Sequence, residues 1–280
     1  MSCITKIRQN YEYFTQTEKK IADYIIENSK NVINISTQEL AELTKTSPAS
    51  IVRFSRSLGF DGFGELKIEL VKSLQSFNDE EIDTILKHDD TVEEMVQKIE
   101  GRVQNTLEDT VKLINFKSLE EALNSIKKAE TIYLLGVGAS ALVAMDLQQK
   151  LLRINRRCVF NLDSNLGLAT SVHITEKDVV IAISYGGRTK EVNLAVKKAR
   201  DNGAKCIAIT KWGKTPLSAL SHISIFLPNN EGELRIGAIN SRFAQLLITD
   251  IIYLGIAKEN FELTEHHLRE TKKIVQPLKE

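Results

Sequence analysis

The 280-residue chain lacks several features that would each point to a class of protein. Its net charge is zero, with 37 basic and 37 acidic residues, which argues against indiscriminate nucleic-acid binding but leaves room for a local basic patch. No apolar run approaches the roughly 18 residues that a membrane span requires. Residues 1–9 lack the apolar stretch of a signal peptide. We therefore expect a cytoplasmic protein.

Cysteine is scarce as well. The three cysteines, Cys3, Cys158 and Cys206, are widely spaced, which fits neither a disulfide framework nor a zinc site. The histidines show no metal-binding spacing, and His266 and His267 are expected to be exposed in a polar C-terminal tail. The sequence therefore predicts no metal site and no cofactor.

Two kinds of pattern divide the chain. Residues 1–77 carry apolar residues at helical spacing, and residues 78–90 are acidic and polar. From Thr131 onward, short β-branched runs alternate with helical segments, which is typical of a parallel sheet covered by helices on both faces. We expect an α/β protein with an all-helical domain at 1–77, a linker with a connecting helix at 78–114, and a parallel-sheet α/β sandwich at 115–280.

The boundaries of the expected elements follow from local signals. Strands are predicted at 132–135, 158–162, 179–183, 206–209 and 223–227. Capping boxes at 91–94 and 118–121 predict the starts of two helices, and a last long helix is predicted at about 237–257.

Residues 36–58 contain two short helices joined by a tight turn. Ser36 and Glu39 form a capping box at the start of the first helix. Ser47 is the expected N-cap of the second, with Pro48 at its first helical position, and Gly59 is expected to end it. This spacing is typical of a helix-turn-helix, whose second helix enters the major groove of DNA.

The second helix carries only positive charge. Arg53 suits contact with guanine or phosphate, and Ser47 and Ser50 lie near the helix N-terminus, where free N–H groups attract phosphate. The predicted DNA contacts are Ser36, Thr37, Lys45, Ser47, Ser50, Arg53 and Arg56. A plain helical hairpin with a solvated arginine face would carry the same charges, so these residues alone leave both interpretations open.

Two glycine-rich loops each follow a predicted strand and open a helix. The loop 136–140 has glycines at 136 and 138, and such a turn lets backbone N–H groups approach an anion in front of the helix dipole. The loop 184–189 places Ser184 and Thr189 around two glycines. Two such loops at the carboxyl ends of strands predict one phosphate held from both sides.

Each loop alone has a simpler interpretation as a tight turn with a helix cap. The first loop also satisfies the G-x-G-x-x-G/A pattern of a dinucleotide-binding fold, with Ala141 last and Asp163 ending the next strand. A nicotinamide-dependent oxidoreductase is therefore one alternative. The second loop argues against an oxidoreductase, because a dinucleotide site does not need a second, hydroxyl-rich turn.

The N-terminal motifs resemble the DNA-binding domain of RpiR-family regulators. The matching segments are Glu-Leu-Ala at 39–41, Ser-Ile-Val-Arg-Phe at 50–54, and Leu-Gly-Phe, Gly-Phe and Leu-Lys between 58 and 67. Ser50 stands where threonine is usual in that family, so a hydroxyl is kept.

The two loops resemble those of the SIS (sugar isomerase) domain. The family's second serine in the loop 184–189 is Gly186 here, which removes one phosphate-binding hydroxyl. The segment 231–242 is similar to the family's E-x-x-x-R-x-G-A-x-x-S-R pattern, which implies acidic contacts to sugar hydroxyls and an arginine that pairs with a carboxylate or braces a dimer. The sugar-phosphate contacts implied are Gly138, Ser140, Ser184, Tyr185, Gly186, Gly187, Thr189, Glu231, Glu233 and Arg242. For the last three, a solvated loop and a structural ion pair are the alternative.

The order of the motifs implies a transcription regulator whose affinity for operator DNA is controlled by a phosphorylated sugar, and not an enzyme. The alternative is an SIS-type isomerase or lyase with an accessory helical domain, for which Glu231 and Glu233 would supply acid–base groups. The expected partners are double-stranded operator DNA, a sugar phosphate and a second copy of the chain, because helix-turn-helix proteins read two half-sites.

Overall fold

The computed structural model describes residues 3–74, 85–232 and 234–279. Contacts divide the chain into two units, one formed by residues 1–98 with 230–237 and the other by residues 99–229 with 238–280. Residues 78–84 of the predicted linker lie outside the described residues. In the described ranges, no helix is long and apolar enough to cross a membrane.

The N-terminal unit is helical, as the sequence predicts. Its elements are α1 (Cys3–Gln9), η1 (Tyr11–Tyr13), α2 (Gln16–Glu27), α3 (Ser29–Val32), α4 (Thr37–Thr44), α5 (Pro48–Ser57) and α6 (Phe63–Leu74). Helix α7 (Val92–Leu113) begins in this unit and continues into the second. The buried ring of Phe54 on α5 packs edge-on against Phe14 with 5.2 Å between ring centroids, and joins α5 to a core that includes Ile21, Ile25 and Leu66.

Local capping chemistry sets the ends of α4 and α5. The Ser36 hydroxyl accepts from the N–H of Glu39 at 3.1 Å, and the Glu39 carboxylate accepts from the N–H of Ser36 at 2.6 Å. Hydrogen bonds from the backbone N–H and the side chain of Ser36 favour the charged carboxylate and lower the pKa of Glu39. Lys45 adopts the left-handed conformation, with φ 54°, at the end of α4. Ser47 caps α5, as predicted, and Pro48 is its first residue.

Two expectations from the sequence were wrong, one about where a helix starts and one about the end of the chain. Helix α8 (Phe116–Lys128) begins before the predicted box at 118–121, because the Asn115 side chain accepts from the N–H of Ser118 at 2.9 Å and so caps the helix earlier. The predicted polar C-terminal tail is the helix α14 (Phe261–Val275), which the Asn260 side chain caps. The box at 91–94 is confirmed, since Thr91 and Glu94 make both reciprocal bonds.

The second unit contains a parallel sheet of five strands in the order β2-β1-β3-β4-β5. The strands are β1 (Ile132–Gly136), β2 (Cys158–Phe160), β3 (Val179–Ile183), β4 (Lys205–Lys211) and β5 (Ile223–Leu227). The other elements, after α8, are α9 (Ala139–Arg153), α10 (Ser164–Thr170), η2 (Ser171–His173), α11 (Lys190–Asp201), α12 (Pro216–Leu220), α13 (Asn240–Ala257), η3 (Lys258–Asn260), α14 and η4 (Gln276–Lys279).

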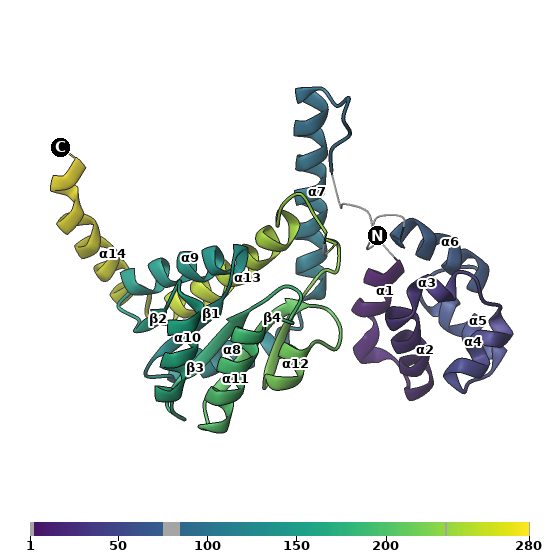
Figure 1. Ribbon diagram of the computed structural model, residues 1–280, viewed down its shortest axis with the longest axis horizontal. Helices are drawn as coiled ribbons and strands as arrows, with labels where there is room; N and C mark the ends of the chain where they lie inside the picture. The colour runs from purple at the N-terminus through teal and green to yellow at the C-terminus, as the bar shows by residue number, and fades with distance from the viewer. Residues whose placement is uncertain (1–2, 75–84, 233, 280) are drawn as a thin grey trace. The chain divides into compact units, whose positions relative to one another are not determined.

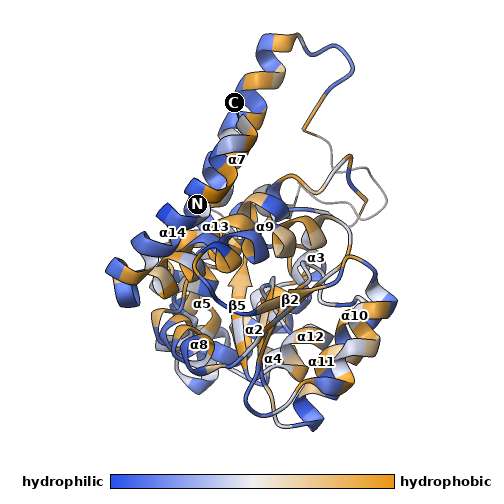
Figure 2. Cartoon of the chain, turned by 90° about the vertical axis from the view of Figure 1, so that its left-hand side faces the viewer, coloured by the Kyte–Doolittle hydropathy of each residue, from blue (hydrophilic) through white to orange (hydrophobic). Residues whose placement is uncertain are grey.

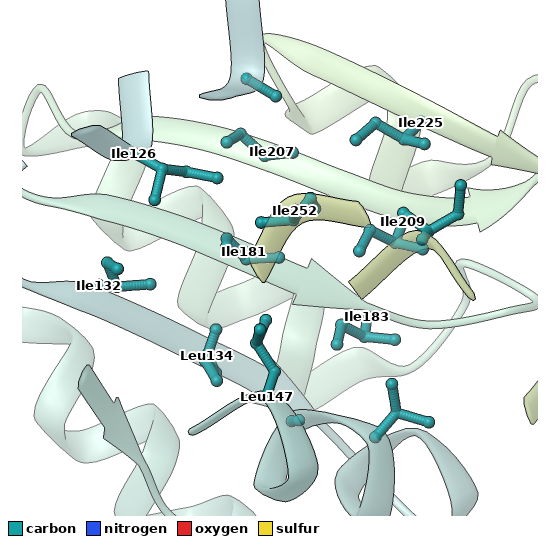
Figure 3. Packing of buried hydrophobic residues seen from close by; sticks show 14 of the residues in the cluster. Ile126, Ile132, Leu134, Leu147, Ile181, Ile183, Ile207, Ile209, Ile225 and Ile252 are labelled. Carbon is teal, nitrogen blue, oxygen red and sulfur yellow. The ribbon is translucent and has the colours of Figure 1, made fainter. Parts of the chain in front are cut away.

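Helices cover both faces of this sheet (Figure 1). Side chains alternate along each strand, so Ile181 and Ile183 of β3 pack with α8, α9 and α13, whereas Val180 and Ala182 pack with α11 and α12. Figure 3 shows the first of these cores, where Ile252 of α13 meets the isoleucines of the central strands. In Figure 2 the strand β5 is orange, while α7 and α11 carry both orange and blue residues.

The three cysteines are free and buried. Burial raises the pKa of the Cys3 and Cys158 thiols to about 12 and that of Cys206 to about 11. Each therefore stays a protonated, unreactive thiol at neutral pH.

Phe54→Ala tests the core of the helical unit. We expect it to lower the local free energy of opening of α2 and α5 by about 3–5 kcal/mol, because a large buried ring leaves a cavity. Native-state hydrogen exchange measures this quantity. Leu43→Ala, at a leucine that is 53% exposed, is the control and should change it by less than about 0.5 kcal/mol. Equal losses in the two variants would contradict the core assignment.

Candidate functional site

The two glycine-rich loops begin at the same edge of the sheet. β1 and β3 are neighbours, and Gly136 lies opposite Ile183 in their parallel register. From β1 the chain crosses to β2 on one side, and from β3 it crosses to β4 on the other. The loops 136–140 and 184–189 therefore diverge at the point where the strand order reverses, which is where open parallel sheets bind ligands.

The first loop is shaped by close backbone packing. A Cβ on Gly136 would lie 2.8 Å from the carbonyl oxygen of Ser140, so only glycine fits. Gly138 has φ 61° and gives α9 no side-chain cap, which leaves the N-terminal N–H groups of this 15-residue helix available to an anion. The buried amide of Gln245 on α13 donates to the Ser140 hydroxyl at 3.0 Å and so orients it.

The second loop brings two hydroxyls together. The oxygens of Ser184 and Thr189 are 3.1 Å apart, and the N–H of Gly187 donates to the carbonyl of Ser184 at 3.1 Å to close a turn between them. Thr189 is the N-cap of α11 but makes no side-chain capping bond. The hydroxyl pair thus sits at an uncapped helix N-terminus, where a phosphate oxygen finds O–H and N–H donors together.

Neighbouring elements hold the second loop rigid. The Tyr185 carbonyl accepts from the Thr210 hydroxyl at 3.1 Å and from the N–H of Lys211 at 2.9 Å, both on β4. The Tyr185 hydroxyl donates to the carbonyl of Pro228 at 2.8 Å. The N–H of Leu217 on α12 donates to the carbonyl of Gly187. Tyr185 therefore anchors the loop through its backbone and its phenol, a role that its sequence position did not indicate.

The two central glycines of this loop differ. Gly187 has φ 66°, and a Cβ there would lie 2.5 Å from the Thr215 hydroxyl oxygen. Gly186 has no left-handed φ, and a Cβ there would meet nothing within 4 Å. Glycine is required at 187, whereas position 186 has room for the serine that the SIS pattern carries.

The acidic segment after β5 lies in the stretch 230–237. This stretch is assigned to the N-terminal unit by its contacts. The Glu231 side chain is 3% exposed, and its carboxylate lies 3.4 Å from the guanidinium of Arg235. Glu233 lies outside the described residues. Arg242 at the start of α13 stacks over the ring of Phe243, 5.6 Å from its centroid.

The predicted DNA contacts fall into two groups. Ser47, Ser50 and Arg53 form a hydrogen-bonded row on α5, with 2.9 Å between the serine hydroxyls and 3.3 Å from the guanidinium to Ser50. Arg53 and Lys45 are exposed. By contrast, Ser36 caps α4, Thr37 is half-buried, and the Arg56 guanidinium donates to the carbonyl of Asp61, so these three carry structural roles as well.

Searches against known proteins agree with this arrangement. Residues 1–77 match the model of the helix-turn-helix domain of the rpiR family, and residues 125–255 match the SIS domain. The chain is 36% identical over 269 residues to an uncharacterized HTH-type transcriptional regulator of Caldanaerobacter subterraneus, covering 96% of this chain and 95% of that one. The chain belongs to the RpiR family of transcription regulators. The regulator YbbH of Bacillus subtilis is 32% identical, with 94% and 93% covered.

Solved RpiR-type structures resemble it as well. The Vibrio vulnificus NanR protein, solved in complex with ManNAc-6P, matches with 29% identity and a TM-score of 0.64 over 99% of both chains. The sugar isomerase domain of an RpiR transcription factor from Sphaerobacter thermophilus matches 64% of this chain and 98% of its own, at 18% identity and a TM-score of 0.56, which shows the shared fold. The predicted fold class and family are thus confirmed.

Substitutions at the two glycines test the geometry of the second loop. Gly187→Ala should destabilise the second unit by at least about 1–2 kcal/mol, because a left-handed backbone strains any L side chain and the new Cβ meets Thr215. Gly186→Ala is the matched control and should be nearly neutral. Thermal unfolding followed through Trp212 measures both. A neutral Gly187→Ala would contradict the described loop.

Proposed function

We propose that this RpiR-family regulator binds operator DNA through α5 and that a phosphorylated sugar, held between the loops 136–140 and 184–189, controls its affinity for DNA. The proposed domains are 1–77 for DNA, 78–114 as the connection and 115–280 for the ligand. The observation that carries the proposal is the placement of both loops at the reversal of strand order, each in front of an uncapped helix N-terminus.

The phosphate is proposed to take donors from both loops. The hydroxyls of Ser140, Ser184 and Thr189 and the first N–H groups of α9 and α11 surround the end of β1 and β3. A dianionic phosphate satisfies these donors better than a neutral sugar, because hydrogen bonds to charged acceptors are roughly twice as strong. The ManNAc-6P complex of the NanR relative supports a phosphorylated sugar as the ligand class.

DNA is proposed to meet the row of Ser47, Ser50 and Arg53, in which Ser47 and Arg53 are exposed and Ser50 is half-buried, with the exposed Lys45 before it in the chain. The serines lie in the first turn of α5, where backbone N–H groups also face a phosphate, and Arg53 lies one turn further along, within reach of a base edge. Two copies of this helix would read two half-sites, so we propose a dimer. The ligand changes operator affinity by binding one DNA-binding geometry better than another.

We propose that the chain works in the cytoplasm as a regulator and not as an isomerase. Its relatives from Caldanaerobacter and Bacillus are named as regulators. Of the two glutamates that could supply acid–base groups, Glu231 lies within the described residues. Its carboxylate is buried and pairs with Arg235, which favours a structural role. Turnover of any sugar phosphate by the purified chain would contradict this part of the proposal.

Arg53→Ala tests the DNA surface. We expect operator binding to weaken by about 1–3 kcal/mol, which is roughly ten-fold or more, because one charged contact is lost. Ligand binding should be unchanged. Fluorescence anisotropy at fixed salt measures DNA affinity, and the salt must be fixed because phosphate contacts make the affinity salt-dependent. Arg153→Ala, at an exposed arginine of α9, is the control and should bind DNA normally.

The double variant Ser184→Ala with Thr189→Ala tests the phosphate loop. It removes both hydroxyls of the pair, so the affinity for a sugar phosphate should fall by at least about ten-fold while DNA binding without ligand is kept. Calorimetry measures ligand binding.

Gly186→Ser is the opposite test of the same loop. It adds a hydroxyl where there is room, and should tighten binding relative to Gly186→Ala. A folded double variant at 184 and 189 that loses DNA and ligand binding equally would overturn the assignment of the two roles.

A further inference from the structure

Asn193 reaches back from α11 to the second glycine-rich loop. Its side-chain Nδ2 donates to the carbonyl of Gly187 at 3.2 Å, and its backbone N–H donates to the carbonyl of Thr189 at 3.0 Å. The N–H of Leu217 donates to the same Gly187 carbonyl at 3.1 Å from α12, which packs beside α11 on one face of the sheet (Figure 1). Two donors from two helices therefore hold this one carbonyl.

The Asn193 amide is an unfavourable choice for packing alone. A carbonyl can only accept hydrogen bonds, so the amide nitrogen must be the atom that faces Gly187. This orientation leaves the Asn193 Oδ1 buried and without a hydrogen-bond partner among the described residues. Burying such an acceptor lowers the free energy of unfolding, whereas a leucine, which has the same branched arrangement of heavy atoms, would avoid that loss. The bond to Gly187 is therefore the interaction that distinguishes asparagine from leucine here.

The loop needs such an anchor because Gly186 and Gly187 follow each other between the two hydroxyls. Successive glycines give the backbone great conformational freedom, which must be lost when the loop is ordered. β4 holds the first half of the loop through the carbonyl of Tyr185. In the second half, the N–H of Gly187 bonds to the carbonyl of Ser184, and its own carbonyl bonds to α11 and α12. Bonds on both sides of Gly187 thus maintain its left-handed φ of 66° and the 3.1 Å between the hydroxyls of Ser184 and Thr189.

We propose that Asn193 is a positioning residue for the phosphate, an inference that rests on the proposed ligand site between the two loops. It holds the Gly187 peptide so that the hydroxyls of Ser184 and Thr189 and the first N–H groups of α11 are in place before the anion arrives. Donors that are ordered in advance lose less conformational entropy on binding. Without the amide, the N–H of Leu217 still satisfies the Gly187 carbonyl, so the fold is kept and the ordering of the loop is weakened.

Asn193→Leu in the full-length chain tests this role. Inorganic phosphate is the probe, and the backbone amide signals of the loops 136–140 and 184–189 in NMR spectra report its binding. We expect the dissociation constant for phosphate to rise at least about three-fold, which is the effect of one hydrogen bond. The midpoint of thermal unfolding should stay the same or rise, because the buried oxygen is gone, whereas loss of a merely structural asparagine would lower it. A rise of less than three-fold would overturn the proposal.

Asn202→Leu is the matched control at the other end of α11. The Asn202 side chain donates to the carbonyls of Val172 at 3.2 Å and Ile174 at 2.9 Å, away from the loop. The same chemical change there should lower the midpoint of unfolding and leave the affinity for phosphate unchanged. Equal losses of affinity in the two variants would show a general effect on the helix and contradict a specific role of Asn193.

A double-mutant cycle with Gly186→Ala reports whether Asn193 acts through the order of the loop. Alanine at 186 already restricts the free loop, so Asn193→Leu should weaken phosphate binding less in that background. Equal losses in both backgrounds would contradict positioning through the loop. If the loop amides of the wild-type chain do not respond to phosphate, the proposed ligand site itself is wrong. A normal wild-type response with an unchanged Asn193→Leu variant would overturn the role of Asn193 alone.

Discussion

The parallel pairing of β1 with β3 is the constraint on which the candidate ligand site depends. Their register places Gly136 opposite Ile183, so the chain leaves both strands at one level and turns in opposite directions around the sheet. The alternation of side chains along β3 fixes this register, because a slip by one residue would exchange the isoleucine face, which meets α9 and α13, with the valine and alanine face, which meets α11. The position of the two loops at one edge of the sheet is thus a consequence of core packing.

The two loops at this edge of the sheet are held in place by hydrogen bonds within the protein, which form without a ligand. Gln245 orients the Ser140 hydroxyl, and β4 and α12 hold the backbone of Tyr185 and Gly187. Pre-oriented donors lose little conformational entropy when an anion arrives, which favours binding. The same logic applies on α5, where the Ser47–Ser50–Arg53 row is ordered by its own hydrogen bonds before DNA is present.

Much of this could be predicted from sequence because the signals were local. The bounds of β3 and β5, the caps at Ser36 and Ser47 and both glycine-rich loops follow from patterns of a few residues. What could not be predicted is non-local. Ser140 and Gln245 are 105 residues apart, and the need for glycine at 187 arises from Thr215 on a later turn. Helix α14 could not be predicted either, because none of its residues is buried and its sequence therefore shows no continuous apolar stripe.

The central claim is that one molecule couples a sugar-phosphate site to operator binding. The most direct test is fluorescence anisotropy of the full-length chain on its own upstream DNA and on scrambled DNA, at fixed salt, across a panel of phosphorylated sugars and their unphosphorylated forms. The account predicts preferential binding to the upstream DNA that one phosphorylated sugar changes and its unphosphorylated form does not. Equal, weak binding to both DNAs, unaltered by every ligand, would contradict it.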